Sequence, residues 1–170
     1  RGLLERCRGQ EGFGGQRGLG DAQQDALPGR GDLPGRFGGD GIEALFLNRL
    51  DPAAHPYYAG IAHLRVSAHF LIRRRGELIQ FVPCAARAWH AGVSSWRGRQ
   101  RCNDFSIGIE LEGTDERPFT EAQYRRLATL LRALRRAYPI VTVTGHSDIA
   151  PGRKSDPGPY FDWQRLPAPA

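Results

Sequence analysis

The stretch between residues 106 and 146 constrains the fold most. The spacing of its apolar residues changes there from that of a strand to that of a helix, and then back to that of a strand. Residues 106–111 alternate apolar and polar side chains, which predicts a half-buried strand with Glu110 on the face away from the core. From Thr120 onward the sequence fits a capping box and then places apolar residues at three- and four-residue steps, until Pro139 ends the helix. Residues 141–144 are typical of a short strand that delivers His146 at its end. A strand, a helix and another strand in succession predict an α/β domain with a mixed central β-sheet flanked by helices.

Weaker patterns precede this stretch. Residues 42–50 carry one apolar face, as a helix would. Residues 66–72 and 78–82 are typical of strands, and residues 74–77 between them supply a turn that contains a glycine. The arginines of the helix after Thr120 are interpreted as its solvated face and receive no chemical role; they are Arg125, Arg126, Arg132, Arg135 and Arg136.

Composition divides the chain near Phe37. Residues 1–36 are dominated by Gly, Arg, Gln and Asp and show neither helical nor strand periodicity, so they predict an irregular segment without a core-forming element. Residues 37–170 have ordinary periodicity and are expected to form one domain.

The overall composition indicates which classes of partner and which cellular compartment to expect. The net charge of +6 comes mainly from arginine, but no aromatic platform or helix-turn-helix pattern accompanies it, so we expect no nucleic-acid partner. No apolar run reaches membrane-spanning length, and we expect no membrane partner. Three cysteines at wide spacings do not suggest a disulfide framework, which favours a reducing compartment and predicts a cytoplasmic protein.

The most informative chemical motif covers residues 145–158, a loop with three glycines and two prolines. It places His146 and Asp156 ten positions apart, and an imidazole and a carboxylate are ligands that a catalytic zinc accepts. A loop of this kind can bring both side chains to one point. Lys154, the only lysine in the chain, could meet negative charge in a hydrolytic transition state. The alternative interpretation is a surface turn whose His and Asp are close only in sequence.

Four motifs in the same order resemble the cytoplasmic N-acetylmuramoyl-L-alanine amidases of the AmpD type, namely residues 64–69, 87–94, 101–113 and 145–158. The similarity extends from about Phe37 to Trp163. It implies an amidase and peptidoglycan-recognition-protein-like fold, zinc as cofactor, and a monomer. It also implies hydrolysis of the amide between N-acetylmuramic acid, in its 1,6-anhydro form, and L-alanine, for the recycling of cell-wall muropeptides.

The resemblance also implies site residues. His146 and Asp156 correspond to two of three zinc ligands, and Glu110 and Lys154 to catalytic residues. The substrate-binding residues would be Arg65 and Arg101, which bind carboxylates, and Trp89, His90 and Gly92, which form a wall of the peptide groove.

Several neighbouring residues compete for these roles. Asp148 could replace Asp156, although orienting the imidazole or capping the turn suits it better. Glu112 is the rival of Glu110. His69 is expected to make a structural hydrogen bond, and His90 is a less favoured further zinc ligand.

One departure from the family concerns the metal. The first zinc ligand of the family is a His on an early strand, but counting back from Phe37 places Pro28 there, and no His precedes His55. The first strand is therefore expected to be missing or irregular. One hypothesis is that residues 1–34 are translated out of frame. The other is a metal-deficient protein that binds muropeptides without catalysis, or that is inactive.

Overall fold

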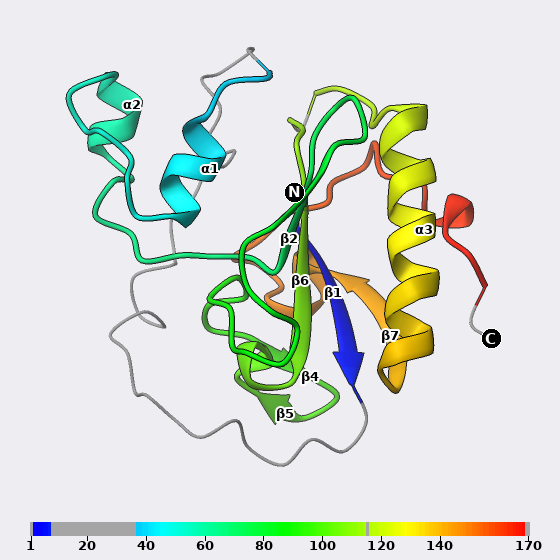
Figure 1. The fold of residues 1–170 in the computed structure, drawn as a ribbon. Helices are drawn as coiled ribbons and strands as arrows, with labels where there is room; N and C mark the ends of the chain where they lie inside the picture. Colours follow the sequence, from blue (N-terminus) through cyan, green and yellow to red (C-terminus); the bar gives the residue numbers. More distant parts are fainter. Residues whose placement is uncertain (1, 8–36, 115, 169–170) are drawn as a thin grey trace.

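The computed structural model describes residues 2–7, 37–114 and 116–168, and a five-stranded mixed sheet lies at its centre (Figure 1). The strand order is β3 (Leu78–Gln80), β2 (Phe70–Ile72), β6 (Ser106–Leu111), β1 (Gly2–Cys7) and β7 (Ile140–Gly145). β2 and β6 are parallel, whereas the other neighbouring strands are antiparallel. The predicted mixed sheet is confirmed.

Helices cover both faces of this sheet (Figure 1). The long helix α3 (Glu121–Ala137) packs its buried leucines against Ile107 and Ile109 of β6. On the other side, α1 (Gly41–Phe46) and the loops around α2 (Pro56–Ala59) form a second apolar cluster that includes Leu71 of β2. Successive residues of a strand point to opposite faces, so β2 contributes to both clusters.

Short elements complete the described part of the chain. They are the hairpin of β4 (Ser95–Trp96) and β5 (Arg99–Gln100), the 3-10 turns η1 (Cys102–Asp104) and η2 (Trp163–Arg165), and the one-turn helix α4 (His146–Ile149). A third apolar cluster joins Cys102 of η1 and Phe105, which follows η1, to Ile149 of α4 and Ala150, which follows α4. This packing holds the segment before β6 against the loop that follows β7.

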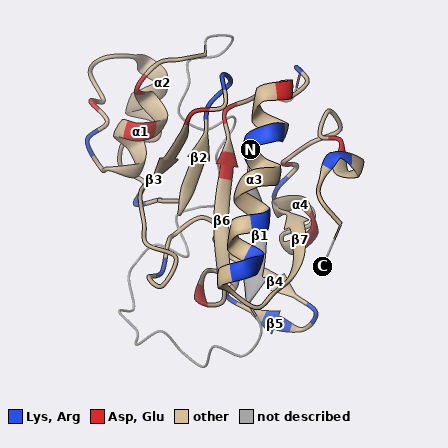
Figure 2. Cartoon of the chain, turned by 45° about the vertical axis from the view of Figure 1, so that its right-hand side comes forward, with Lys and Arg blue, Asp and Glu red and all other residues tan. Residues whose placement is uncertain are grey.

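The helix α3 forms as the sequence predicts. Its N-cap Thr120 accepts a hydrogen bond from the backbone N–H of Gln123 at 3.2 Å, and the Gln123 side chain accepts one from the N–H of Thr120 at 3.0 Å, which is a capping box. Arg125 and Arg132 are exposed, and the helix carries a basic outer face (Figure 2). No helix among the described residues is both long and apolar enough to cross a membrane.

The prediction that β6 is half-buried is wrong, because all six of its residues are buried. α3 covers the face of Ile107 and Ile109, and the ring of His90 lies over Gly108 on the other face. Glu110 is therefore only 2% exposed, although it points away from the apolar core.

The N-terminal prediction is also wrong in part, since Gly2–Cys7 form the strand β1 in the middle of the sheet. In the register, Leu4 is opposite Gly108 of β6 and Thr144 of β7. Backbone N–H and C=O groups pair irrespective of side-chain periodicity, and two neighbouring strands offer such groups here. Residues 8–36, Pro28 among them, lie outside the described residues, and the domain boundary near Phe37 stays a prediction.

Three predicted elements are shorter than expected. The strand predicted over 78–82 is β3 and ends at Gln80. The helix predicted over 42–50 is α1 and ends at Phe46, where the left-handed backbone of Asn48 (φ 56°) follows closely. The strand predicted over 66–72 is β2 and begins at Phe70, although the N–H of His69 already donates to Gly108 of β6 at 3.0 Å; further back, the N–H of Ser67 bonds instead to the carbonyl of Trp89 at 2.9 Å.

Candidate active site

The loop after β7 brings His146 and Asp156 together. Nδ1 of His146 lies 2.6 Å from Oδ2 of Asp156, and both side chains are largely buried. The backbone N–H of Ser147 also donates to the carbonyl of Asp156 at 2.9 Å. The alternative of a His and an Asp that meet only in sequence is thus wrong.

Local backbone contacts fold this loop. A side chain at Gly145 would place its Cβ 2.5 Å from Pro157, so only glycine lets residues 156–157 pass over the end of β7. Asp148 Oδ2 accepts from the Thr144 hydroxyl at 2.6 Å and from the N–H of Gly145 at 3.0 Å. Asp148 therefore caps the turn, in agreement with one of its two expected roles.

Three histidines form a row beneath this loop. The rings of His146 and His90 are stacked with centroids 6.0 Å apart, and His90 and His69 meet edge to face at 5.8 Å. A Cβ on Gly108 would lie 2.4 Å from the ring of His90, so the imidazole rests directly on the backbone of β6. His90 is fully buried, and the structure places it below the surface rather than along an open wall.

His69 has the structural role predicted for it. Its Nδ1 accepts from the N–H of Gly108 at 2.9 Å, so Nε2 carries the hydrogen and donates to the carbonyl of Ala86 at 3.0 Å. Burial lowers the pKa of His69 below its ordinary value, because the charged imidazolium is costly to bury. Both ring nitrogens are engaged, and neither is available to a metal.

The two competing glutamates have different surroundings. Glu112 accepts backbone hydrogen bonds from Gly38 at 2.6 Å and Arg74 at 2.7 Å, so its carboxylate joins the end of β6 to two other segments. Glu110 lies on the same strand face as Gly108 and hence on the face of the stacked histidines. Its surroundings favour Glu110 over Glu112 as the catalytic candidate.

Lys154 is half-buried in the same loop as Asp156. Its backbone N–H donates to the carbonyl of Ala150 at 3.0 Å, which fixes the chain just after α4. The neighbouring Arg153 donates through Nη2 to the carbonyls of Ala91 and Val93, and so ties this loop to the segment before β4.

A cavity of about 440 Å³ opens between these two segments. Gly92 and Arg101 line one side, and residues of the loop after α4, Ile149 and Pro151 among them, line the other. The structure therefore brings two of the predicted substrate-binding residues next to the motif of His146 and Asp156.

The remaining substrate-binding candidates lie elsewhere. Trp89 is half-buried, and the guanidinium of Arg87 is stacked 3.8 Å from the centre of its ring. Arg65 is exposed and donates to the carbonyl of Ala62 in its own segment. Binding of substrate by these residues stays a prediction.

The described residues do not complete a zinc site. His146 and Asp156 supply two donor atoms of the correct type, but no group of three or more His, Cys, Asp or Glu side chains within residues 2–7, 37–114 and 116–168 could hold a metal ion. A catalytic zinc ordinarily has three protein ligands and a water.

Sequence reasoning gave no role to the turn η1. The side-chain oxygen of Asn103 accepts from the backbone N–H groups of His90 and Ala91, at 3.0 and 2.8 Å. Asp104 forms ion pairs with Arg87 and Arg101. An Asn–Asp pair before a strand is typical of a turn, and its sequence alone does not indicate these distant partners.

Comparison with known proteins agrees with this geometry. Residues 42–159 match the family model described as N-acetylmuramoyl-L-alanine amidase, and this range contains every candidate site residue. The chain belongs to this amidase family. It is 64% identical over 137 residues to the 1,6-anhydro-N-acetylmuramyl-L-alanine amidase AmpD of Citrobacter freundii, a match that covers 79% of this chain and 73% of the relative.

Two solved amidase structures extend the comparison. A crystal structure of an Se-Met AmpD derivative superimposes with a TM-score of 0.77 at 59% identity and covers 84% of each chain. The amidase AmiD of Escherichia coli, in complex with anhydro-N-acetylmuramic acid-L-Ala-D-γ-Glu-L-Lys as substrate, gives a TM-score of 0.58 at 40% identity over 64% of this chain and 49% of its own. The expected amidase fold, a mixed sheet with flanking helices, is confirmed.

Proposed function

We propose that this chain hydrolyses the amide between 1,6-anhydro-N-acetylmuramic acid and L-alanine in muropeptides, in the recycling of cell-wall fragments. The observation that carries the proposal is the contact between His146 and Asp156, 2.6 Å apart, in a loop whose residues Ile149 and Pro151 line a cavity together with Arg101. Its relatives in the family, which share 64% of aligned residues with it, are named for this reaction.

The protein side chains have distinct parts in this reaction. Glu110 would take a proton from the attacking water, whose oxygen bonds to the amide carbon. Lys154 would stabilise the tetrahedral oxyanion with its ammonium group. The C–N bond then breaks, and the proton held by Glu110 passes to the leaving amine.

Zinc is the cofactor proposed with this activity, and His146 and Asp156 are the residues proposed to hold it. Because two ligands do not form a catalytic zinc site, the third must come from outside the described residues. We also propose a cytoplasmic location, because the few cysteines suit a reducing compartment, and a monomeric state.

The incomplete ligand set favours a second candidate function, a muropeptide-binding protein without catalysis. Its cavity and arginines would still bind a peptide carboxylate, since neither requires the metal.

One experiment separates the two candidates. The chain is compared with a chimera in which the N-terminal segment of the Citrobacter freundii relative replaces residues 1–36, and both receive anhydro-N-acetylmuramic acid-L-Ala-D-γ-Glu-L-Lys with zinc. Mass spectrometry of the products and calorimetric binding are measured. Cleavage by this chain supports the amidase, whereas cleavage by the chimera alone, with binding but no cleavage by this chain, supports the binder. Binding without cleavage by both proteins supports the binder, and absence of binding by both contradicts the two proposals.

A further inference from the structure

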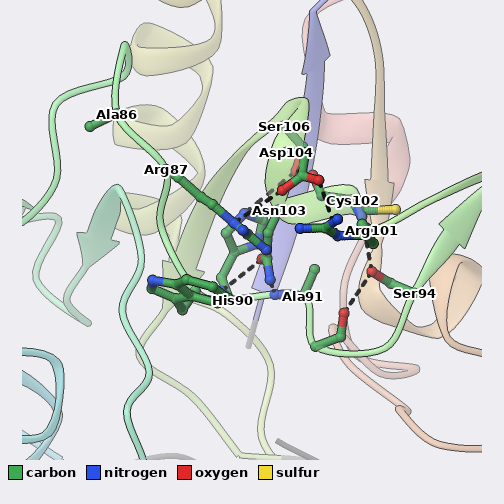
Figure 3. Close-up of polar contacts among 12 residues, drawn as sticks. Ala86, Arg87, His90, Ala91, Ser94, Arg101, Cys102, Asn103, Asp104 and Ser106 are labelled. Atoms are coloured by element: carbon green, nitrogen blue, oxygen red, sulfur yellow. Dashed lines mark hydrogen bonds and ion pairs between the residues drawn. The ribbon is translucent and has the colours of Figure 1, made fainter. Parts of the chain in front are cut away.

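The turn η1 is a polar centre that connects the candidate substrate-binding residues (Figure 3). Asn103 fixes the backbone of His90 and Ala91, as described above. The N–H of Cys102 donates to the hydroxyl of Ser94 at 3.2 Å. These bonds attach the segment of residues 90–94 to the turn that leads into β6.

Asp104 at the end of this turn lies between two arginines (Figure 3). Its Oδ1 is 3.1 Å from Nε of Arg87, and its Oδ2 is 3.2 Å from Nε of Arg101. The Arg87 side chain is 14% exposed and stacks on Trp89, whereas the Arg101 side chain is 55% exposed and lines the cavity. One carboxylate thus connects an inner arginine to an outer one.

The backbone of Arg101 is constrained as well. Its φ is 62°, in the left-handed region that non-glycine residues rarely occupy. The N–H of Arg101 donates to the carbonyl of Ser94, and its carbonyl accepts from the N–H of Asp104, both at 2.9 Å. The turn therefore fixes the point from which the side chain extends.

This geometry leaves Arg101 able to bind an anion. The ion pair with Asp104 is formed at Nε, so the terminal nitrogens can receive a carboxylate, which a guanidinium binds well in a planar, bidentate manner. One carboxylate between two guanidiniums also leaves a net positive charge at the rim of the cavity.

We propose that Asp104 is a positioning residue that orients Arg101 toward a carboxylate of the substrate peptide. This inference rests on the proposed function. The competing explanation is that Asp104 only stabilises the fold, and the two make different predictions about which ligands lose affinity.

The test measures calorimetric binding to the full chain of two matched probes. The first is anhydro-N-acetylmuramic acid-L-Ala-D-γ-Glu-L-Lys, and the second is the same compound with its peptide carboxylates converted to carboxamides. Asp104→Asn should weaken binding of the carboxylate probe about tenfold and leave binding of the carboxamide probe unchanged. Asp104→Glu should recover part of the loss. Asp51→Asn, which removes an exposed carboxylate that accepts from the N–H of Ala53 in its own turn, is the control.

A double-mutant cycle gives the second readout. In an Arg101→Gln background, Asp104→Asn should cause no further loss, because the group that it orients is absent. If Asp104→Asn does not fold, Arg101→Lys is the substitute: it keeps the charge but lacks the Nε contact, and it should also weaken the carboxylate probe selectively.

Three results would overturn the proposal. These are wild-type affinity of Asp104→Asn for the carboxylate probe, an equal loss of both probes, and additive effects in the cycle. Failure of the wild-type chain to bind either probe contradicts the proposed function itself, and the role of Asp104 with it.

Discussion

Nδ1 of His146 and Oδ2 of Asp156 are 2.6 Å apart. Two such ligands on one tetrahedral zinc ion, each at about 2.0–2.2 Å from the metal, would be about 3.3 Å from each other. The two side chains are therefore hydrogen-bonded directly to each other. Nδ1 and Oδ2 would have to move apart slightly before both could bind one metal ion. The pair lies in the same loop as Lys154, and the ring of His146 is stacked on that of His90.

The first prediction concerns zinc content. After dialysis against zinc and then against buffer, the chain should retain far less metal than the chimera with the relative's N-terminal segment, which should hold about one zinc ion per chain. The reason is the third ligand that the described residues do not supply. Atomic absorption measures the content, and equal values would show that another residue of this chain completes the site.

The second prediction concerns the catalytic candidates, tested in the chimera. Lys154→Ala and Glu110→Gln should each retain zinc. Lys154→Ala should raise the barrier of the reaction by about 2.7–4 kcal/mol, as loss of one oxyanion donor does. Glu110→Gln should lower the rate by about 10²–10⁴-fold, as loss of a general base does. Product formation under saturating substrate gives the rate. Glu112→Gln is the matched control, since it should lower the free energy of unfolding and keep the rate of the folded enzyme. A normal rate in either active-site variant removes that residue from the mechanism.

The third prediction concerns β1. Deletion of residues 1–7 should leave β7 without a neighbouring strand in the described sheet and β6 paired with β2 alone, because β1 pairs with both β6 and β7. Hydrogen exchange measured by mass spectrometry should then become faster in peptides from residues 106–110 and 140–145, with little change in β3, which pairs only with β2. Unchanged exchange would mean that the sheet does not depend on β1, and the hypothesis of an out-of-frame segment would gain support.

The fourth prediction concerns the close contact between Gly108 and His90. Gly108→Ala should lower the free energy of unfolding by about 1–3 kcal/mol, since the new methyl group would overlap the imidazole ring. Gly60→Ala is the control: its Cβ would meet only one atom, at 3.5 Å, and its effect should stay within about 0.5 kcal/mol. Urea unfolding gives the free energy of unfolding of both variants. Similar values for the two would contradict the packing described for His90.

The fifth prediction concerns pH. Burial lowers the pKa of His69 in the folded state, whereas the unfolded chain has the ordinary value of 6.5. The unfolded state therefore binds the proton first, and this site should reduce stability as the pH falls below 6.5, by at most about 1.4 kcal/mol per pH unit. The free energy of unfolding should stop falling from this cause once the pH is below the pKa of His69 in the folded state.

The measurement is the free energy of unfolding between about pH 5 and pH 8, a range that covers histidine titration. His69→Gln should show a flatter pH dependence than the wild-type chain, and replacement of the exposed His63 serves as control. A slope unchanged by His69→Gln would contradict the burial of a neutral imidazole at this position.

The sequence alone predicts those elements that are stabilised by interactions between residues close together in the chain. The capping box at Thr120 and the spacing of leucines after it predict α3, because both depend on residues three or four positions apart. In the same way, the short strand before His146 and the glycines and prolines after it predict a loop that could bring His146 to Asp156. The resemblance of four motifs to the amidase family also needed no structure.

Tertiary structure alone decided features that join distant parts of the chain. The burial of Glu110 depends on what covers each face of β6, and the strand formed by Gly2–Cys7 pairs with backbone groups of β6 and β7, which are more than 95 residues away in the sequence. Likewise, Asp104 acquires a role only because folding places Arg87, 17 residues earlier, beside the turn that also holds Arg101. Sequence periodicity reports which face of an element is apolar, but it carries no information about which partner will meet that face.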